Sequence, residues 1–417
     1  MSAHEVPTPI DRVPFFTKGT MIVAAIAGLG IFAYIYRLIF GIGAATNLDN
    51  QYPWGIWIAI DVASGVALAA GGFTTAALAD IFHKEKCHVI VRPALLTALL
   101  GYTFVVIGLL ADLGRYYNVW HPMLPSMWQG NSVLFEVGMC VMVYLTVLYI
   151  EFLPIVVERF GGRVNLPGPL KVFNKLIDSW LSICHRFLGR FISLFIIAGV
   201  VLSCLHQSSL GTLMVIAPTK MHPLWYSPIS PLMFLMSAIA VGFPMVIFES
   251  LIASRSFKLK PETKILSSIA TYTPILLGAY LAVKIGDLTI REVWPLVFDG
   301  SFQAMMYIIE IVLGVITPII LLSQAKIRNS VAGLFTSASL VIFGVMFNRI
   351  NVFLTAYKPL YPEGAYFPSM FEIFVTVGLI CALVLVYRFI VLNLPVIAVP
   401  TNDHSNEKNN VGVVKAA

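Results

Sequence analysis

The chain has 417 residues, of which 58% are hydrophobic and only 12% charged, and its mean hydropathy is +0.86. Soluble domains carry about 25% charged residues, so this chain has too little polar surface to cover a soluble globule. Disorder is also excluded, because disordered segments are poor in apolar residues and rich in charge. The composition therefore indicates an integral membrane protein. Its net charge of +6 then indicates membrane orientation rather than nucleic-acid binding.

Ten stretches are apolar over the roughly 20 residues that a helix needs to cross a bilayer. They are 19–41, 54–80, 92–112, 131–157, 188–209, 229–253, 264–285, 302–323, 330–348 and 369–392. We predict an all-α integral membrane protein with about ten transmembrane helices, in which spans 2–5 and 6–9 form two four-helix bundles and the others flank them. The division is then an N-terminus (1–18), a first helix group (19–209), a second helix group (210–400) and a polar tail (401–417).

The basic residues indicate how the spans are oriented. With the N-terminus placed in the cytoplasm, only seven of the 27 Lys and Arg fall on or near the outer side: Arg37, Arg115, Lys220, Lys284, Arg291, Arg349 and Lys358. The other 20 fall in the termini and in the loops after the even-numbered spans. Because Lys and Arg favour the cytoplasmic side, both termini are predicted to be cytoplasmic. In the longest cytoplasmic loop, 170–181 is expected to form an amphipathic helix lying on the membrane.

Five ionisable residues from four consecutive spans are expected at a similar depth near the outer side: Asp61, Asp112, Arg115, Glu136 and His206. Ionisable groups inside a membrane are costly and are usually functional. Three carboxyls against one arginine and one imidazole leave charge for protons to neutralise, which suits a site that takes up and releases protons. The alternative is a structural network in which Arg115 neutralises Asp112 and His206 makes ordinary hydrogen bonds at its helix end.

A second set of acids lies deeper or toward the cytoplasm: Asp80, Glu151, Glu249 and Glu310. Together with Asp61 and Glu136 these acids could form a proton relay. Alternatively, the first three simply reach the cytoplasmic interface, an explanation that does not extend to Glu310 because it lies about two turns from either end of its span. Arg349 and Glu372 are expected to form an ion pair between adjacent helices.

Histidine and cysteine positions argue against a bound metal or haem. The five cysteines are scattered and contain no C-x-x-C pair, which excludes the usual spacings of iron–sulfur clusters and structural zinc. A b-type haem between membrane helices usually takes two histidines at matching depth on different helices. His185 and His206 lie on one span about 30 Å apart, and only a contrived pairing of His88 with His185 remains. We expect no haem, no iron–sulfur cluster and no metal in this chain.

Several motifs occur in order along the chain: Tyr52-Pro-Trp-Gly-Ile-Trp-Ile-Ala-Ile-Asp61, Asp112-Leu-Gly-Arg115-Tyr, Asn131-Ser-Val-Leu-Phe-Glu136, His206-Gln-Ser-Ser-Leu-Gly211, Met221-His-Pro-Leu-Trp225 and Tyr366-Phe-Pro368. Over nearly its whole length the sequence resembles the NrfD/PsrC family of quinone-interacting membrane subunits. Within that family it is most similar to the membrane subunits of periplasm-facing nickel–iron uptake hydrogenases.

The resemblance implies a multi-pass protein of the bacterial inner membrane that binds menaquinone or ubiquinone near the outer surface, within spans 2–5. A periplasmic ferredoxin-like iron–sulfur subunit and a catalytic subunit would dock on the outer face, since the outer loops are too short to hold such machinery. The quinone-binding residues would be Asp112, Arg115, His206, Gln207, Glu136 and Trp57. Proton transfer would use Asp61, Glu136, Asp80, Glu151, Glu249 and Glu310.

Three other functions fit parts of the sequence. The chain could serve another complex of the same family, such as a cytochrome c-linked menaquinone reductase. A proton-coupled secondary transporter would show Gly/Pro-broken helices at matching positions of two halves. Gly242-Phe-Pro244 and Thr317-Pro318 occur in the second half, but the first half has no convincing match. A mere membrane anchor would leave the outer acids unexplained.

Overall fold

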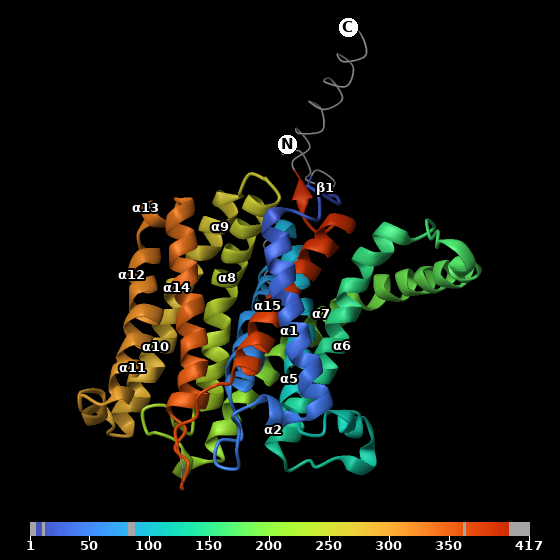
Figure 1. Cartoon of the computed structure of the whole chain (residues 1–417). Helices are drawn as coiled ribbons and strands as arrows, with labels where there is room; N and C mark the ends of the chain where they lie inside the picture. Colours follow the sequence, from blue (N-terminus) through green and yellow to red (C-terminus); the bar gives the residue numbers. More distant parts are fainter. Residues whose placement is uncertain (1–5, 11–12, 82–87, 362–363, 400–417) are drawn as a thin grey trace.

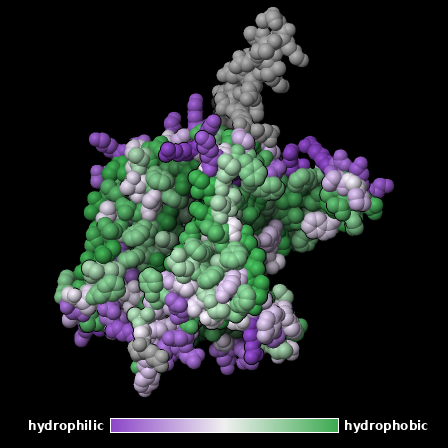
Figure 2. Space-filling model, viewed as in Figure 1, coloured by the Kyte–Doolittle hydropathy of each residue, from purple (hydrophilic) through white to green (hydrophobic). Residues whose placement is uncertain are grey.

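The computed structural model describes residues 6–10, 13–81, 88–361 and 364–399, with the side chains of Val6, Asp80, Ile81, His88 and Val399 left out of the description. Ten helical spans in this part of the chain are long and apolar enough to cross a membrane, which confirms the predicted all-α membrane fold. Figure 2 shows a hydrophobic middle zone with hydrophilic residues gathered at the two ends.

Six of the spans consist of one continuous α-helix: α1 (Lys18–Phe40), α5 (His88–Asp112), α6 (Val133–Phe160), α7 (Asn174–Val215), α8 (Ser230–Ser256) and α15 (Met370–Asn393). The seventh span joins α9 (Thr263–Ala270) to α10 (Tyr272–Ile290). The eighth joins α11 (Phe302–Ile311), η10 (Val312–Ile316) and α12 (Thr317–Ser323), and the ninth joins α14 (Val331–Ile350) to η11 (Asn351–Thr355). Short helices α2 (Ile42–Ala45) and α13 (Ala325–Arg328) lie in the connections.

The second span alternates between π-helical and α-helical turns. It consists of η1 (Trp57–Ser64), α3 (Gly65–Leu68), α4 (Gly71–Ala76) and η2 (Ala77–Ile81), with π-helical turns in η1 and η2. Its small residues Ala59, Ala63, Ala67 and Gly71 are all buried, so the stripe they form packs against neighbouring helices. This span is the most enclosed of the ten, and its polar side chains therefore face protein rather than lipid.

The first and last spans lie side by side, and strands β1 (Val6–Pro7) and β2 (Ala398–Val399) lie at one end of the molecule (Figure 1). α1 and α15 approach closely because Gly30 faces Gly378: a Cβ atom on Gly30 would lie within 3 Å of the backbone of α15. Strand β1 pairs antiparallel with β2. We call this the termini end and the opposite one the far end.

The two predicted helix groups are in direct contact. α8 packs against α4 and α7 of the first group and against α10 and α14 of the second, and α14 also packs against η1. In Figure 1, α10 to α14 lie on one side of α8, and α5 to α7 lie on the other. The division into two four-helix bundles stays a prediction, because the shared contacts do not separate one bundle from the other.

The fifth span differs from its prediction in length. The sequence pattern suggested a span at 188–209 and a separate amphipathic helix at 170–181. Instead, α7 runs without a break from Asn174 to Val215, preceded by the short helix η7 (Gly168–Phe173). Nothing between the two predicted segments interrupts hydrogen bonding, since Gly189 is tolerated within a helix and there is no proline. Together with the end of α6, the first half of α7 leans away from the other helices (Figure 1).

Candidate functional site

A buried arginine lies at the far end of the first span. Arg37, in the last turn of α1, is completely buried although most of α1 faces outward. Its Nε donates to the carbonyl of Ala111, and its Nη2 donates to the carbonyl of Leu113 at 2.5 Å, which ties α1 to the end of α5. Its third nitrogen, Nη1, is buried without a hydrogen-bond partner in the described structure.

Asp112 is the last residue of α5 and faces the same space. Three charged side chains act on it electrostatically: Arg37, Glu372 and Asp61. No ion pair closes between Arg37 and Asp112 among the described residues, and Asp112 Oδ1 is buried without a hydrogen-bond partner. Nearly all buried polar atoms in proteins are hydrogen-bonded, so an unpartnered donor and an unpartnered acceptor on two residues that interact electrostatically require an explanation.

Glu372 is completely buried in the first turn of α15. Its Oε1 accepts a hydrogen bond from the hydroxyl of Tyr366, and its Oε2 accepts from the backbone N–H groups of Asn47, at 3.1 Å, and Ser369, at 2.8 Å. Trp57 Nε1 donates to the backbone carbonyl of Glu372 at 3.1 Å. Burial, reinforced by Glu372, raises the pKa of Tyr366 well above its ordinary value, so the hydroxyl keeps the proton that it donates.

Asp61, in η1, is the third carboxyl of this group. Its Oδ2 accepts from Thr376 Oγ1 at 2.6 Å, which links the second span to the last. A Cβ atom on Gly108 would lie 2.8 Å from the Cβ of Asp61, so only glycine at position 108 leaves room for this carboxyl. We call Arg37, Asp61, Asp112 and Glu372 the Arg37 cluster. With all four side chains ionised, the cluster would have a net charge of −2. The cluster therefore favours proton uptake or a ligand that donates hydrogen bonds.

Two sequence-based expectations at this site are wrong. Arg115 is exposed beyond the end of α5, and the arginine that acts on Asp112 is Arg37 from the first span. The expected ion pair between Arg349 and Glu372 does not form, because Arg349 donates to Ser237 Oγ at 2.8 Å and to Asn348 Oδ1 at 2.7 Å. Arg349 thus belongs to the second helix group, whereas Glu372 faces the first.

Glu136, His206 and Gln207 lie apart from the Arg37 cluster, on α6 and α7. Glu136 Oε1 accepts from Ser209 Oγ at 2.5 Å. His206 is buried, with its Nδ1 3.3 Å from the hydroxyl of Tyr102, and Gln207 Nε2 donates to the carbonyl of Val66 at 2.7 Å. The structure therefore divides the predicted outer layer in two. One half faces α1 and α15, and the other lies between α5, α6 and α7.

Glu310 is buried in the second helix group and receives four hydrogen bonds. Lys284 Nζ lies 2.6 Å from Oε1 and forms an ion pair with it. The other donors are Trp225 Nε1 at 2.9 Å, Asn348 Nδ2 at 2.8 Å and Asn351 Nδ2 at 2.9 Å. A carboxylate held by a buried cation and three further donors is stabilised in its ionised form. Glu310 is thus the ion-pair partner of Lys284 rather than a free proton carrier.

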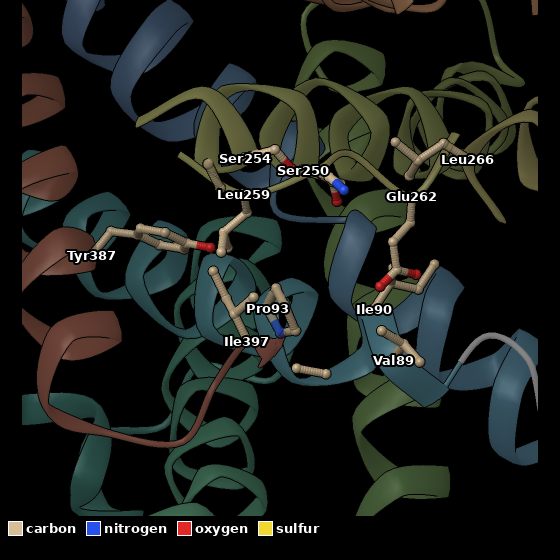
Figure 3. A pocket seen from close by; sticks show the side chains of 13 residues that line it. Val89, Ile90, Pro93, Ser250, Ser254, Leu259, Glu262, Leu266, Tyr387 and Ile397 are labelled. Carbon is tan, nitrogen blue, oxygen red and sulfur yellow. The ribbon is translucent and has the colours of Figure 1, made fainter. Parts of the chain in front are cut away.

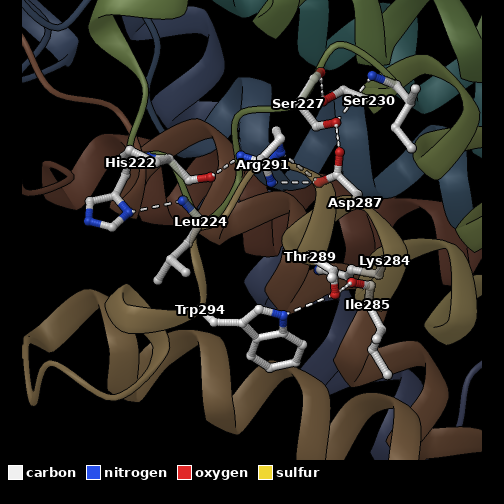
Figure 4. A network of polar contacts seen from close by, with 12 residues as sticks. His222, Leu224, Ser227, Ser230, Lys284, Ile285, Asp287, Thr289, Arg291 and Trp294 are labelled. Carbon is white, nitrogen blue, oxygen red and sulfur yellow. Dashed lines mark hydrogen bonds and ion pairs between the residues drawn. The ribbon is translucent and has the colours of Figure 1, made fainter.

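A second polar network lies beyond this ion pair, at the far end (Figure 4). Asp287, about one turn beyond Lys284 on α10, accepts from Arg291 Nε at 2.9 Å and from Ser227 Oγ at 2.6 Å. Lys284, Asp287, Arg291 and Ser227 all line one cleft. Tyr307 also lines it, and its hydroxyl is buried without a hydrogen-bond partner in the described structure. The second helix group therefore has a polar cleft at the far end, and Lys284, the ion-pair partner of Glu310, lines it.

The remaining predicted acids lie toward the termini end. Glu249 Oε1 accepts from the hydroxyl of Tyr387 at 2.7 Å, and Tyr387 also lines a pocket between the start of α5, the end of α8 and the segment that contains β2 (Figure 3). Glu151 packs against α7 at Gly199. The side chain of Asp80 lies outside the described residues. Glu249 is therefore half-buried, and its partner Tyr387 lines a pocket at the termini end.

The sequence analysis did not assign Arg37, Lys284, Tyr366 or Asn351 to a site. Arg37 and Lys284 were counted as charges at outer span ends, yet both are buried. The signal that could have found them was present, because a Lys or Arg within an apolar stretch needs a buried partner. For Asn351 the amide gave no such signal, since amides occur commonly at helix ends.

Comparison with known proteins shows the family to which this chain belongs. Residues 44–360 match the family described as "Polysulphide reductase, NrfD", and the chain therefore belongs to the NrfD family. It is 33% identical over 408 residues to the "Probable Ni/Fe-hydrogenase 2 b-type cytochrome subunit" of Escherichia coli, covering 96% of this chain and 98% of that one. A protein of Nitratidesulfovibrio vulgaris is 37% identical over 391 residues, covering 91% and 95%.

A more distant relative is the "Menaquinone reductase, integral membrane subunit" of Nitratidesulfovibrio vulgaris, which is 26% identical over 348 residues and covered over 77% of each chain. The E. coli relative's name includes a b-type cytochrome, which implies haem. The described histidines do not fit one. His206 is engaged by Tyr102, and His185 is exposed on the same helix about 30 Å away. His121 and His222 lie in far-end connections.

Proposed function

We propose that this chain is the quinone-reactive membrane subunit of a periplasm-facing redox complex in the bacterial inner membrane, with both termini in the cytoplasm. Electrons would pass between a docked ferredoxin-like iron–sulfur subunit and menaquinone or ubiquinone near the far end. The lead assignment is a hydrogenase:quinone oxidoreductase. It is supported by the relative named as a hydrogenase subunit, which the chain matches over nearly its full length.

The observation that carries the proposal is the unpartnered pair in the Arg37 cluster. A quinone carbonyl is a hydrogen-bond acceptor and would suit Arg37 Nη1. A quinol hydroxyl is a donor and would suit Asp112 Oδ1. A quinol, whose hydroxyl groups both accept and donate, would satisfy both buried atoms at once, whereas an oxidised quinone would need a protonated Asp112. Without a ligand, the two unpartnered atoms cost free energy of about 1–3 kcal/mol each. The protein would supply position and protons, while the quinone and the iron–sulfur cluster would supply the electron chemistry.

Proton delivery is assigned to the acids around this position. Asp61 and Glu372 adjoin Asp112 electrostatically and could exchange protons with it. Glu136, near His206, would serve from the neighbouring helices, and Glu151, Glu249 and Asp80 would extend the route toward the cytoplasm. We propose Tyr387 and its pocket as the cytoplasmic entrance to Glu249. Glu310 would belong to a separate passage in the second helix group.

The experiment is to compare two activities of the complex that copurifies with the tagged chain. One is reduction of a soluble menaquinone analogue, and the other is reduction of a dye that accepts electrons directly from the catalytic subunit. Asp112→Asn and His206→Ala should abolish the first and preserve the second. Wild-type quinone activity in both variants would refute the quinone site.

The transmembrane proton path needs its own measurement. The complex is reconstituted in liposomes and the internal pH is followed during quinone turnover. Proton movement from the cytoplasmic side should disappear in Asp80→Asn, Glu151→Gln and Glu249→Gln, with electron transfer retained. If the wild type moves no protons from that side, or all three variants behave like it, the path does not exist.

Two alternatives predict different results. A cytochrome c-linked menaquinone reductase would copurify with a cytochrome rather than a hydrogenase, and a relative named as a menaquinone reductase subunit favours this alternative. A proton-coupled transporter would move a solute without any redox partner. Tagged purification followed by identification of the bound subunits separates all three functions.

A further inference from the structure

The long helix α7 is much longer than a bilayer crossing requires. Its 42 residues extend over roughly 63 Å at 1.5 Å per residue, whereas the hydrocarbon core is about 30 Å thick. The C-terminal half already crosses, since it contains His206 and packs against α8. The N-terminal half, together with the end of α6 and the connection between them, forms the leaning segment of Figure 1. We call residues 159–190 the arm.

The arm presents three distinct faces. Leu181 and Leu188, seven residues apart, are buried. A second face carries the exposed apolar side chains Leu176, Trp180, Ile183 and Phe187, whose spacing of four, three and four residues follows one side of a helix. All four are at least 50% exposed, which is far too large an apolar stripe for a face in water.

The third face is basic. Six cationic side chains of the arm are exposed, against the single acid Asp178: Arg159, Arg163, Lys171, Lys175, Arg186 and Arg190. Lys175, Arg186 and Arg190 follow one helical side beside the apolar stripe. Within the described part of the chain, none of these six side chains makes a hydrogen bond or ion pair. By contrast, Arg92 near the same end is paired with Glu158, and Arg388 is hydrogen-bonded to Ser256.

These faces exclude both pure water and pure hydrocarbon as surroundings. The apolar stripe disfavours water, and six unpaired cations disfavour the membrane core. At the boundary between them, apolar side chains reach into the acyl region while Lys and Arg meet the headgroups. Figure 2 shows this division, with hydrophilic residues along the edge of the projecting segment toward the termini end and hydrophobic residues on the side away from it.

We propose that the arm is an interfacial element that binds anionic phospholipid headgroups through its basic face. The unpaired cations require negative charge, and a lipid surface supplies it continuously along the helix. The arm lies toward the termini end, so with the predicted orientation the headgroups belong to the cytoplasmic leaflet. This binding is separate from the quinone site at the far end, and either can fail without the other.

Trp180 provides a local probe, because it lies on the apolar stripe and the other six tryptophans belong to far-end segments. The full complex is placed in nanodiscs of phosphatidylcholine and phosphatidylglycerol in which only one lipid carries bromine, a quencher of tryptophan fluorescence. Subtracting the signal of Trp180→Phe isolates the arm. Brominated phosphatidylglycerol should quench Trp180 more than brominated phosphatidylcholine at the same mole fraction, and the preference should fall at 1 M salt, where the screening length is about 3 Å.

The combined variant Lys171→Gln, Lys175→Gln, Arg186→Gln and Arg190→Gln should lose the preference while Trp180 is still quenched by both lipids. The matched control replaces four exposed cations elsewhere near the termini end: Arg255, Lys258, Lys264 and Lys326. That control should keep the preference. Equal quenching by the two lipids in the wild type would overturn the proposal. Absence of quenching by either would also overturn it, and would point to a protein surface, from a partner or a second copy, covering the arm.

Discussion

Arg37 Nη1 and Asp112 Oδ1 are a buried donor and a buried acceptor on neighbouring helices that interact electrostatically, yet neither atom is hydrogen-bonded within the described residues. A closed ion pair would have satisfied both atoms and left nothing for a ligand. Their separation keeps one hydrogen-bonding position of each side chain available at the far end, where the proposed function needs it.

Arg37→Lys should lower quinone-linked turnover about 10- to 100-fold, because a hydrogen bond to a charged group contributes about 1.5–3 kcal/mol. Lysine keeps the charge, but its single nitrogen cannot bond to the carbonyls of Ala111 and Leu113 and also donate to a ligand. Dye-linked activity should not change. The matched control is Arg115→Gln, which alters an exposed arginine near the same end. If Arg115→Gln had the larger effect, Arg115 rather than Arg37 would be the arginine that binds the quinone, as the sequence first suggested.

Glu310→Gln should lower the free energy of unfolding by about 3–5 kcal/mol, because it leaves the Lys284 ammonium buried without its partner. The double variant Lys284→Met/Glu310→Gln should be less destabilised than the single one. Thermal unfolding in detergent, followed by circular dichroism, measures both. Asp299→Asn, at an exposed position, should differ little from wild type. A double variant as unstable as the single one would show that the pair is not coupled.

The far-end connection around His222 should loosen in acid. Burial lowers the pKa of His222 below its ordinary value of 6.5, with Lys358 acting in the same direction. His222 Nδ1 accepts from the backbone N–H of Leu224, which requires the neutral ring. A depressed folded-state pKa contributes stability above pH 6.5 that is lost as pH falls below it. After correction for the intrinsic exchange rate, which itself falls as the pH falls, the protection of residues 218–229 from hydrogen exchange should therefore be lower at pH 5 than at pH 7. His222→Gln should remove most of this difference.

The purified chain should show no haem absorbance, because the described histidines do not provide two axial ligands at one depth. The measurement is a dithionite-reduced minus oxidised spectrum of the isolated subunit, with haem content determined chemically. A stoichiometric b-type spectrum that disappears in His185→Ala would contradict this prediction.

Both termini are expected in the cytoplasm. Reporter fusions after Asn402 and in the connection near Pro125 should report opposite sides of the membrane, because an odd number of spans separates these positions. Readings from the same side would contradict the predicted topology.

The spans could be predicted closely because hydrophobic length is a local property of the sequence. The site could be predicted only in part, because depth along a helix does not give the direction of a side chain around it. Asp61 and Glu136 were placed at similar depths, yet one faces Thr376 and the other Ser209. Arg37 was missed for a related reason: its role depends on α1 contacting α5 and α15, and contacts between helices distant in sequence leave no periodic pattern.

The pairing of α1 with α15 has a consequence for biogenesis. The Arg37 cluster draws Arg37 from the first span to be synthesised and Glu372 from the last. Until the ribosome has released the final helix, Asp61 lacks Thr376 and Trp57 lacks the carbonyl of Glu372. A chain truncated before α15 would therefore insert its early helices with this acidic face open to lipid. The site is therefore complete only when both α1 and α15 are in place, so its assembly depends on helices that lie more than 300 residues apart in the chain.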